Sequence, residues 1–395
     1  MHNLCSFNSR IKAQRFPVYL AQLAVIGSLL PGLVEAKQPP NPKHASMRNE
    51  CVILDNDFDI DDMQAIPIVL GGKHVAAIIQ SEGYTLPGNA APVVDQLVNQ
   101  IPDQPKNRKI PVIVGGQQSP SPDLNRWPWL PFFRTMMNRA NGLLSSEPAS
   151  WPLDSAYPQK IAAAVHHCKT VEVLLIGTYT SFNNYVALIS DKLKRVVIMG
   201  EHIGDQTRSP GRESFNCSFD INACKAAMPI LKKLNTYFVD IPRLPDCADT
   251  AKPAAHCYNP SLEMVIGSEA VKGQWRGGLV ERGLPGRLRQ ALINPVQCTA
   301  FYTNSANKGK PCTSLSTWEP AAVAKGPGGE MLLWDQTAAL FLVDPSKFSL
   351  YVNPNAPKDG GLHYEPTLVD GSHAKTINRL RNMWTTYTNQ SETIK

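Results

Sequence analysis

The sequence predicts an α/β fold: a mainly parallel central sheet with helices on both faces. From residue 51 onward, short apolar runs of strand length alternate with segments long enough for helices, which is typical of parallel sheets. The chain has 395 residues, 43% of them hydrophobic and 18% charged, so it can bury a large core. Polar residues suited to ligand binding follow several of the apolar runs, and open α/β sheets bind ligands at the carboxyl ends of their strands. Together these observations predict a Rossmann-like open sheet.

Each element is assigned from its apolar pattern and from the polar or glycine-containing breaks that bound it. Strands are expected at 51–55, 74–80, 110–114, 171–176, 194–199 and 235–240. Helices between them are expected at 61–71, 89–101, 157–168, 181–191 and 219–233. A last helix at 331–342 and strands near 348–353 and 363–369 close the same domain. Residues 117–156 and 241–330, rich in Pro, Gly and aromatic residues, are expected to form loops and short helices over the sheet.

The N-terminal part has the features of a secretory signal. Basic residues precede the apolar stretch 16–34, and a small-residue cleavage pattern ends at Ala36. Polar and helix-breaking residues interrupt this stretch, and no later segment is apolar for long enough to span a bilayer, so no stable membrane span is expected after cleavage. An uncleaved anchor is the alternative. We expect a signal peptide at 1–36, a proline-rich linker at 37–49, a single domain at 50–395, and a secreted, periplasmic or extracellular location.

Charge and cysteine content bound the function further. The formal net charge is +6, and no basic run is interleaved with aromatic residues, so nucleic-acid binding has no support. There are nine cysteines, and removal of residues 1–36 leaves eight, an even number that suits export. The neighbouring pairs Cys217/Cys224, Cys247/Cys257 and Cys298/Cys312 suit local disulfides, although their spacing leaves the connectivity open. A small-molecule partner is expected, and a homo-oligomer stays open.

The most informative motif is a cluster of carboxylates directly after the first expected strand. Its members are Asp55, Asp57, Asp59, Asp61 and Asp62. No Lys or Arg lies between Glu50 and Gly72, so a hard divalent cation bound through oxygen would relieve the repulsion between these charges. Two other segments, the turn at 177–181 and the helix start at Asp335, could place oxygen ligands at the same edge of the sheet. One ion with ligands from all three segments would suit Ca²⁺.

These motifs, in this order, resemble the nucleoside hydrolase family of the inosine/uridine-preferring type. The Asp-x-Asp-x-x-x-Asp-Asp motif that opens this family is matched from Asp55 to Asp62. Weaker matches follow at 177–181, 197–201, 214–216, 220–224 and 335–338, so the resemblance extends over roughly residues 50–370. The resemblance implies Ca²⁺-dependent hydrolysis of the N-glycosidic bond of nucleosides, which releases ribose and a free base.

Carried over by position, the resemblance assigns roles to individual residues. The implied Ca²⁺ ligands are Asp57, Asp62, Asp335 and the backbone carbonyl of Thr180. Asp57 would also act as the catalytic proton acceptor for a metal-bound water. The implied substrate contacts are Asp61 and Asn216 on the ribose hydroxyls and Met199 on the 5′ side.

Departures from the family pattern lie around the expected sugar and base pockets. Trp334 occupies a position where many members have His and where a purine-specific branch has Trp, and Trp127 could supply the opposite face of a stacked base. A purine preference is therefore our hypothesis. Tyr84 stands in place of an Asn that contacts the sugar, and Ser214 and Glu201 also differ.

Other interpretations of the same residues remain. The departures at Ser214, Tyr84 and Glu201 motivate a non-catalytic secreted protein that binds a ribosyl ligand on the same fold. A Mg²⁺-dependent phosphatase of the haloacid dehalogenase type would use Asp55 as its nucleophile, but it gives no role to the adjacent Asp61 and Asp62. An EF-hand is disfavoured because Ile60 stands where that loop needs Gly. A solvated acidic turn is the simplest alternative.

Overall fold

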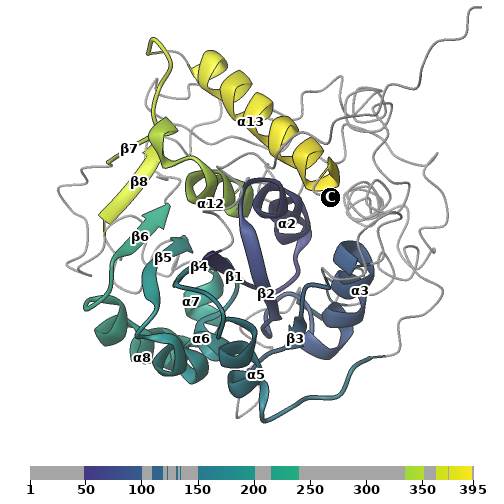
Figure 1. The fold of residues 1–395 in the computed structure, drawn as a ribbon. Coiled ribbons are helices and arrows are strands. Elements are labelled where there is room, and N and C mark those ends of the chain that lie inside the picture. Colours follow the sequence, from purple (N-terminus) through teal and green to yellow (C-terminus); the bar gives the residue numbers. More distant parts are fainter. Residues whose placement is uncertain are drawn as a thin grey trace, which may run out of the picture. The chain divides into compact units, whose positions relative to one another are not determined.

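A predominantly parallel sheet lies at the centre of the fold (Figure 1). The computed structural model describes residues 49–99, 109–118, 122, 130–131, 134, 150–200, 215–239, 334–350, 362–371 and 373–393. All of them belong to one unit, Asn41–Lys395. The expected signal peptide at 1–36 and Trp127 lie outside the described residues.

In the part of the chain that the structure describes, the sheet has eight strands. They are β1 (Glu50–Asn56), β2 (His74–Gln80), β3 (Val112–Val114), β4 (Thr170–Leu175), β5 (Leu193–Met199), β6 (Thr236–Val239), β7 (Phe348–Leu350) and β8 (Leu362–Pro366). Their order is β3-β2-β1-β4-β5-β6-β8-β7, with every neighbouring pair parallel except β7 and β8. The order reverses between β1 and β4. This is the topological switch point at which such sheets bind ligands.

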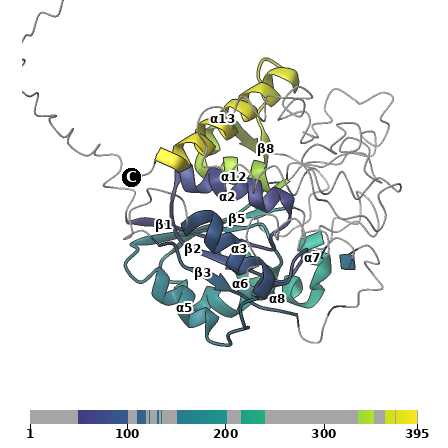
Figure 2. The ribbon, with the colours of Figure 1, turned by 90° about the vertical axis from the view of Figure 1, so that its right-hand side faces the viewer.

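Helices cover both faces of the sheet, as the alternating pattern predicted (Figure 2). One face carries α2 (Ile60–Gly72), α3 (Pro87–Asn99), α12 (Trp334–Val343) and α13 (His373–Thr393). The other carries α5 (Tyr157–Ala164), α6 (Tyr179–Tyr185), the 3-10 helix η3 (Val186–Ile189) and α8 (Ile221–Leu231). The short elements α7 (Phe215–Phe219) and η8 (Pro345–Lys347) complete the described set. None of the described helices is long and apolar enough to cross a membrane.

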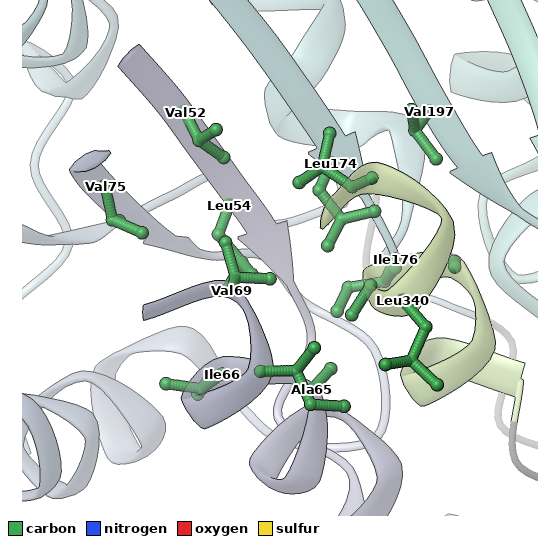
Figure 3. Close-up of a cluster of buried hydrophobic side chains, with 14 of the residues drawn as sticks. Val52, Leu54, Ala65, Ile66, Val69, Val75, Leu174, Ile176, Val197 and Leu340 are labelled. Atoms are coloured by element: carbon green, nitrogen blue, oxygen red, sulfur yellow. The ribbon is translucent and has the colours of Figure 1, made fainter. Parts of the chain in front are cut away.

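The core is divided between the two faces because successive strand residues point in opposite directions. Val52 and Leu54 of β1 pack against the cluster under α2 and α12, where Ile66 and Leu340 meet them (Figure 3). Ile53 belongs to the cluster on the other face, under α5, α6 and α8. Both faces of β1 are therefore buried, which explains why the strand is a continuous apolar run.

Two helices were not predicted. Helix α13 was missed because its sequence is largely polar, although Leu380, Met383, Trp384 and Tyr387 follow the spacing of one helical face and belong to the α2 core cluster. The helix expected at 219–233 is found as α8, whereas the short helix α7 before it was not expected. Asp220 separates the two helices, because its side chain caps α8 by accepting the Ala223 N–H.

Two disulfides join described residues. One links Cys217 to Cys224, a pair of near neighbours in sequence. The other links Cys51 to Cys168 across 117 residues and was not anticipated from spacing. The four remaining cysteines of the predicted neighbouring pairs lie outside the described residues.

Candidate active site

The end of β1 carries buried polar residues to the switch point. Asp55 and Asn56 end the strand, Asp57 follows it, and all three are buried. Phe58 then adopts a φ of 56°, a left-handed conformation that a bulky residue keeps only where its surroundings enforce it. Thr85 provides this constraint, since its N–H donates to the Asp57 carbonyl and its hydroxyl to the Phe58 carbonyl, each at 3.1 Å. The chain therefore turns sharply at Phe58 and enters α2 soon after Asp57.

Asp57 and Asp62 form a pair of buried carboxyl groups, with exposed fractions of 2% and 0%. Asp57 Oδ2 accepts the Tyr84 N–H at 2.9 Å, and Asp62 Oδ2 accepts the Asp59 N–H at 2.7 Å, which caps the start of α2. Burial raises the pKa of Asp57 above its ordinary value, although hydrogen bonds to the Asp62 side chain and the Tyr84 N–H lower it. Two carboxyl groups held this close favour either a shared proton or a bound cation.

The surrounding charges fit a bound cation. Arg134 lowers the pKa of Asp57 through its charge. Its guanidinium, however, is committed to Glu82 Oε1 at 3.2 Å and to the Gly83 carbonyl at 2.8 Å. Because Arg134 neutralises Glu82, the Asp57 and Asp62 carboxylates keep an excess of negative charge that an oxygen-liganded divalent cation would offset.

Gly83 allows the backbone to approach the Asp57 carboxylate. A Cβ at this position would lie 1.9 Å from Asp57 Oδ2 and 2.6 Å from its Cγ, so any larger residue must displace the side chain. The next residue, Tyr84, donates its backbone N–H to the same oxygen. Gly83 and Tyr84 together fix the position of the predicted catalytic carboxylate.

The segment after β4 forms the opposite wall of the switch point. Gly177 packs on the backbone that follows β1, since a Cβ there would lie 2.8 Å from Asp57 N. Thr180, in the first turn of α6, donates its hydroxyl to Asp220 Oδ2 at 2.7 Å, and its carbonyl accepts the Asn184 side-chain amide at 3.0 Å. A carbonyl oxygen has two lone pairs, so a ligand role for it is compatible with this hydrogen bond and stays a prediction.

Asn216 is tied to the same wall. Its side-chain amide donates to the Ile176 carbonyl at 2.5 Å, directly after β4. The Cys217–Cys224 disulfide holds α7, which carries Asn216, against α8. The ring of Phe215 lies 4.5 Å from that of Tyr84, measured between centroids, so the residues predicted to bind the sugar, Asn216 and Tyr84, are linked through Phe215.

Asp335 is buried in the first turn of α12, and this turn lies at the same edge of the sheet as Asp62. Two contacts give the direction of α12. The Leu342 carbonyl near its end accepts Arg195 from the beginning of β5, and Val343 meets Gly72 at the end of α2. Helices α2 and α12 therefore run side by side in the same direction. Their first turns, which carry Asp62 and Asp335, both lie at the carboxyl edge of the strands.

The other predicted substrate residues are placed by their backbone. Met199 is half-buried at the end of β5, and Asp61 lies in the first turn of α2. Trp334 is the first residue of α12, next to Asp335. The strand and helix ends thus bring Asp57, Asp61, Asp62, Thr180, Met199, Asn216, Trp334 and Asp335 to one edge of the sheet.

Sequence reasoning missed a buried polar network beneath this edge. Ser81 donates its hydroxyl to Asp55 Oδ1 at 2.5 Å and lies 2.6 Å from the Ser181 hydroxyl, which accepts the Gly116 N–H at 2.8 Å. The pKa of Asp55 is raised to about 7, chiefly by burial and also by the nearby Asp57 charge, while the Ser81 and Tyr185 hydrogen bonds oppose the rise. Ser81 directly follows the end of β2, so the rule that located the acid cluster could also have found it, whereas Ser181 lies within α6 and carried no such signal.

Glu82 and Arg134 were also missed. Glu82 follows β2 and carried the same positional signal as Ser81. Arg134 had no such signal, since it comes from a stretch without a predicted element, and only the tertiary fold brings it to Glu82 and over the Phe219 ring.

No protein-family model and no curated protein sequence matches this chain. Solved structures do. A purine-preferring ribonucleoside hydrolase from Gardnerella vaginalis is 17% identical and matches with a TM-score of 0.50, covering 87% of this chain and 100% of that one. An inosine-uridine preferring nucleoside hydrolase from Bacillus anthracis is 12% identical with a TM-score of 0.53 and the same coverage. The effector protein XOO4466 is 12% identical with a TM-score of 0.52, covering 88% of this chain and 99% of that one.

At these identities the likeness is evidence for a shared fold alone. The chain has the fold of the nucleoside hydrolases, as the sequence motifs predicted, with the carboxylate pair at its topological switch point.

Proposed function

We propose that this protein hydrolyses the N-glycosidic bond of nucleosides, with a Ca²⁺ ion held by Asp57, Asp62, Asp335 and the Thr180 carbonyl. The observation that carries the proposal is the buried contact between Asp57 and Asp62 at the switch point of this fold. The guanidinium of Arg134 is paired with Glu82 and does not neutralise the two buried carboxylates, so these are suited to a hard cation.

The residues then have distinct tasks. A bound Ca²⁺ supplies a lowered pKa and a fixed orientation for the attacking water. Asp57, fixed through its Oδ2 by the Tyr84 N–H, would accept the proton of the attacking water. The carboxylates also stabilise the positive charge that develops on the sugar as the glycosidic bond breaks. Asp61 and Asn216 hold the ribose hydroxyls, with Asn216 positioned by the Ile176 carbonyl.

The base pocket carries the finer part of the proposal. Trp334 begins α12 beside Asp335, and stacking of a purine on its ring, with Trp127 on the other face, would favour departure of the base. Met199 and Tyr84 line the sugar side. Faster steady-state turnover of inosine than of uridine is expected, and the reverse order would refute the purine preference.

A test of the whole proposal measures ribose release from a panel of nucleosides with the full chain. Asp57→Asn should abolish release, while Asp191→Asn, an exposed acid between η3 and β5, serves as the matched control. Calcium affinity is measured by calorimetry in parallel. Equal activity of Asp57→Asn and the unchanged chain would overturn the mechanism.

The same experiment separates the alternatives. Tight binding of Ca²⁺ and of nucleosides without turnover would favour the ribosyl-binding protein, and the likeness to a protein described as an effector keeps this reading open. The phosphatase reading requires Asp55 as an accessible nucleophile. Asp55 is fully buried and accepts a hydrogen bond from Ser81, which argues against attack on a phosphate.

A further inference from the structure

A second group of ligand-type side chains lies at the opposite edge of the sheet from the candidate active site. Cys51 stands near the beginning of β1, and His74 is the first residue of β2 and its direct partner in the ladder. His167 and Cys168 lie in the turn just before β4, the other neighbour of β1. Three adjacent strands thus contribute two sulfurs and two imidazoles to one location.

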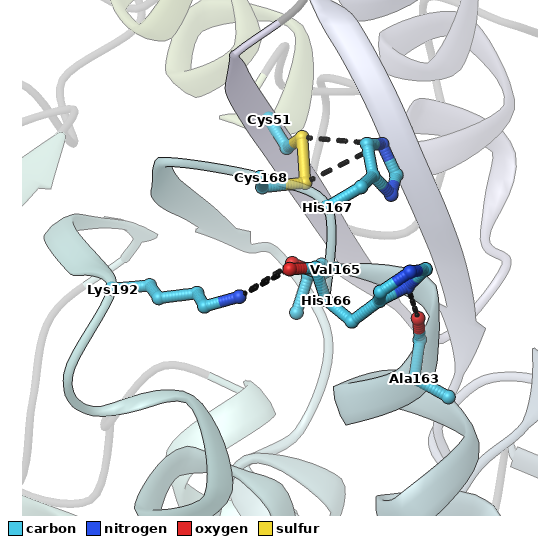
Figure 4. The surroundings of a disulfide bond; sticks show 7 residues. All are labelled: Cys51, Ala163, Val165, His166, His167, Cys168 and Lys192. Carbon is cyan, nitrogen blue, oxygen red and sulfur yellow. Dashed lines mark hydrogen bonds between the residues drawn. A yellow bond between two sulfur atoms is a disulfide. The ribbon is translucent and has the colours of Figure 1, made fainter.

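The distances within this group are those of a compact site (Figure 4). His167 Nε2 lies 3.9 Å from Cys51 Sγ and 3.7 Å from Cys168 Sγ, between the two sulfurs of the disulfide. The potential donor atoms of Cys51, His74 and His167 all lie within 4.8 Å of one another. In a tetrahedral zinc site, bond lengths of about 2.3 Å to sulfur and about 2.0 Å to nitrogen place neighbouring donors about 3.5 Å apart. His167 Nε2 lies within about 0.4 Å of that separation from both sulfurs.

We propose that Cys51, Cys168, His74 and His167 bind one Zn²⁺ when the Cys51–Cys168 disulfide is reduced. Reduction by a phosphine or a dithiol transfers two electrons to the disulfide, breaks the S–S bond and yields two thiols. The phosphine becomes its oxide, with water supplying the oxygen and the two thiol hydrogens, or the dithiol gives up its two hydrogens and becomes a disulfide. Zinc binding then displaces both thiol protons. The completed set is Cys₂His₂, a common donor set of structural zinc sites.

The disulfide and the zinc ion are thereby alternative cross-links of the same strands. The disulfide joins the beginnings of β1 and β4, whereas the metal also includes β2 through His74. Access for the ion is available because His167 is exposed and His74 is half-buried, while both sulfurs are buried. Lys192 fixes the turn that carries His167, since its Nζ donates to the His166 carbonyl at 2.6 Å (Figure 4).

A simpler interpretation makes His167 a hydrogen-bond donor to the disulfide sulfurs. That role involves His167 alone, whereas His74 also brings a ring nitrogen within 4.8 Å of Cys51 Sγ, and its ring lies edge-on to that of His167 with centroids 6.0 Å apart. Two imidazoles converging on two sulfurs are the feature that zinc explains.

The test uses the full chain reduced with a phosphine and titrated with Zn²⁺, and then with Co²⁺ as a spectroscopic substitute. The reduced chain should bind one more equivalent of Zn²⁺ than the oxidised chain. With Co²⁺ it should develop the thiolate-to-cobalt charge-transfer band and the intense visible absorption of a tetrahedral site. Oxygen ligands such as those of Asp57 and Asp62 give no thiolate band, so the acid cluster does not interfere.

Neighbouring histidines provide matched variants. His167→Ala should lose the additional equivalent and weaken the thiolate band, as should His74→Ala. His166→Ala should retain both, because the His166 ring bonds to the Ala163 carbonyl through Nδ1. The double variant Cys51→Ser, Cys168→Ser should also lose the additional equivalent. If it does not fold, the comparison of His167→Ala with His166→Ala still decides the question, because both histidines are exposed. Equal zinc stoichiometry and equal bands in His167→Ala, His166→Ala and the unchanged chain, or no zinc uptake after reduction, would overturn the proposal.

Discussion

Replacing Gly83 with Ala should disable the candidate active site while the fold persists. The new Cβ would lie 1.9 Å from Asp57 Oδ2, so the carboxylate has to move by about 1.5 Å to restore ordinary contact. Asp57 would then lose its hydrogen bond from the Tyr84 N–H and its alignment with Asp62. Displacements of about 1 Å in a catalytic group cost on the order of 100-fold in rate. We expect a loss of that order in kcat/KM together with weaker Ca²⁺ binding.

The assay combines steady-state ribose release, calcium calorimetry and thermal unfolding. Gly72→Ala is the matched control, since its Cβ would lie 2.0 Å from Val343 Cγ1 at the far end of α2. This control should lower Tm without changing Ca²⁺ affinity or kcat/KM at a temperature where the chain is folded. The reasoning would be refuted if Gly83→Ala kept the Ca²⁺ affinity and kcat/KM of the unchanged chain.

Three further predictions concern the surroundings of Asp57. Burial raises the pKa of Asp55 to about 7, so between about pH 4 and about pH 7 the folded chain holds a proton that the unfolded chain has lost. Without metal, the free energy of unfolding should therefore fall by about 4 kcal/mol as the pH rises through this range. Urea titrations of Asp55→Asn with a chelator present should lack this fall. Arg134→Ala removes a charge that lowers the pKa of Asp57, so the acidic limb of the pH–rate profile should move to higher pH, whereas an unmoved limb would contradict this electrostatic role. Thr180→Val loses the hydroxyl hydrogen bond to Asp220 but keeps the backbone carbonyl, so the free energy of unfolding should fall by about 1 kcal/mol with unchanged Ca²⁺ affinity. A loss of Ca²⁺ affinity measured by calorimetry would assign the ligand role to the hydroxyl.

Most of the sheet was predictable because its strands are buried on both faces. β1, β2, β4 and β5 appear as apolar runs with clear polar boundaries, and the structure places each within about two residues of its expected range. Helix α13 was missed since a helix that buries a narrow stripe on α2 carries a mostly polar sequence. The short helix α7 was missed because five residues are too few to show a helical periodicity.

The candidate site was predictable where its residues follow strand ends. Asp57 and Asp62 come directly after an apolar run, and the motif resemblance added Thr180, Asn216 and Asp335 from distant segments. Gly83 and Arg134 were not predictable, since their importance depends on the distance of one atom from the Asp57 side chain and on a pairing with Glu82.

The sequence by itself determined the class of the fold, the carboxylates and the edge of the sheet on which they lie, because burial pattern and strand direction are local properties of the chain. Only the tertiary structure decided that α12 runs beside α2, that Glu82 takes up Arg134, and that Cys51 joins Cys168 across 117 residues. These are contacts between segments far apart in sequence, and they arise from packing against a shared sheet rather than from any local preference.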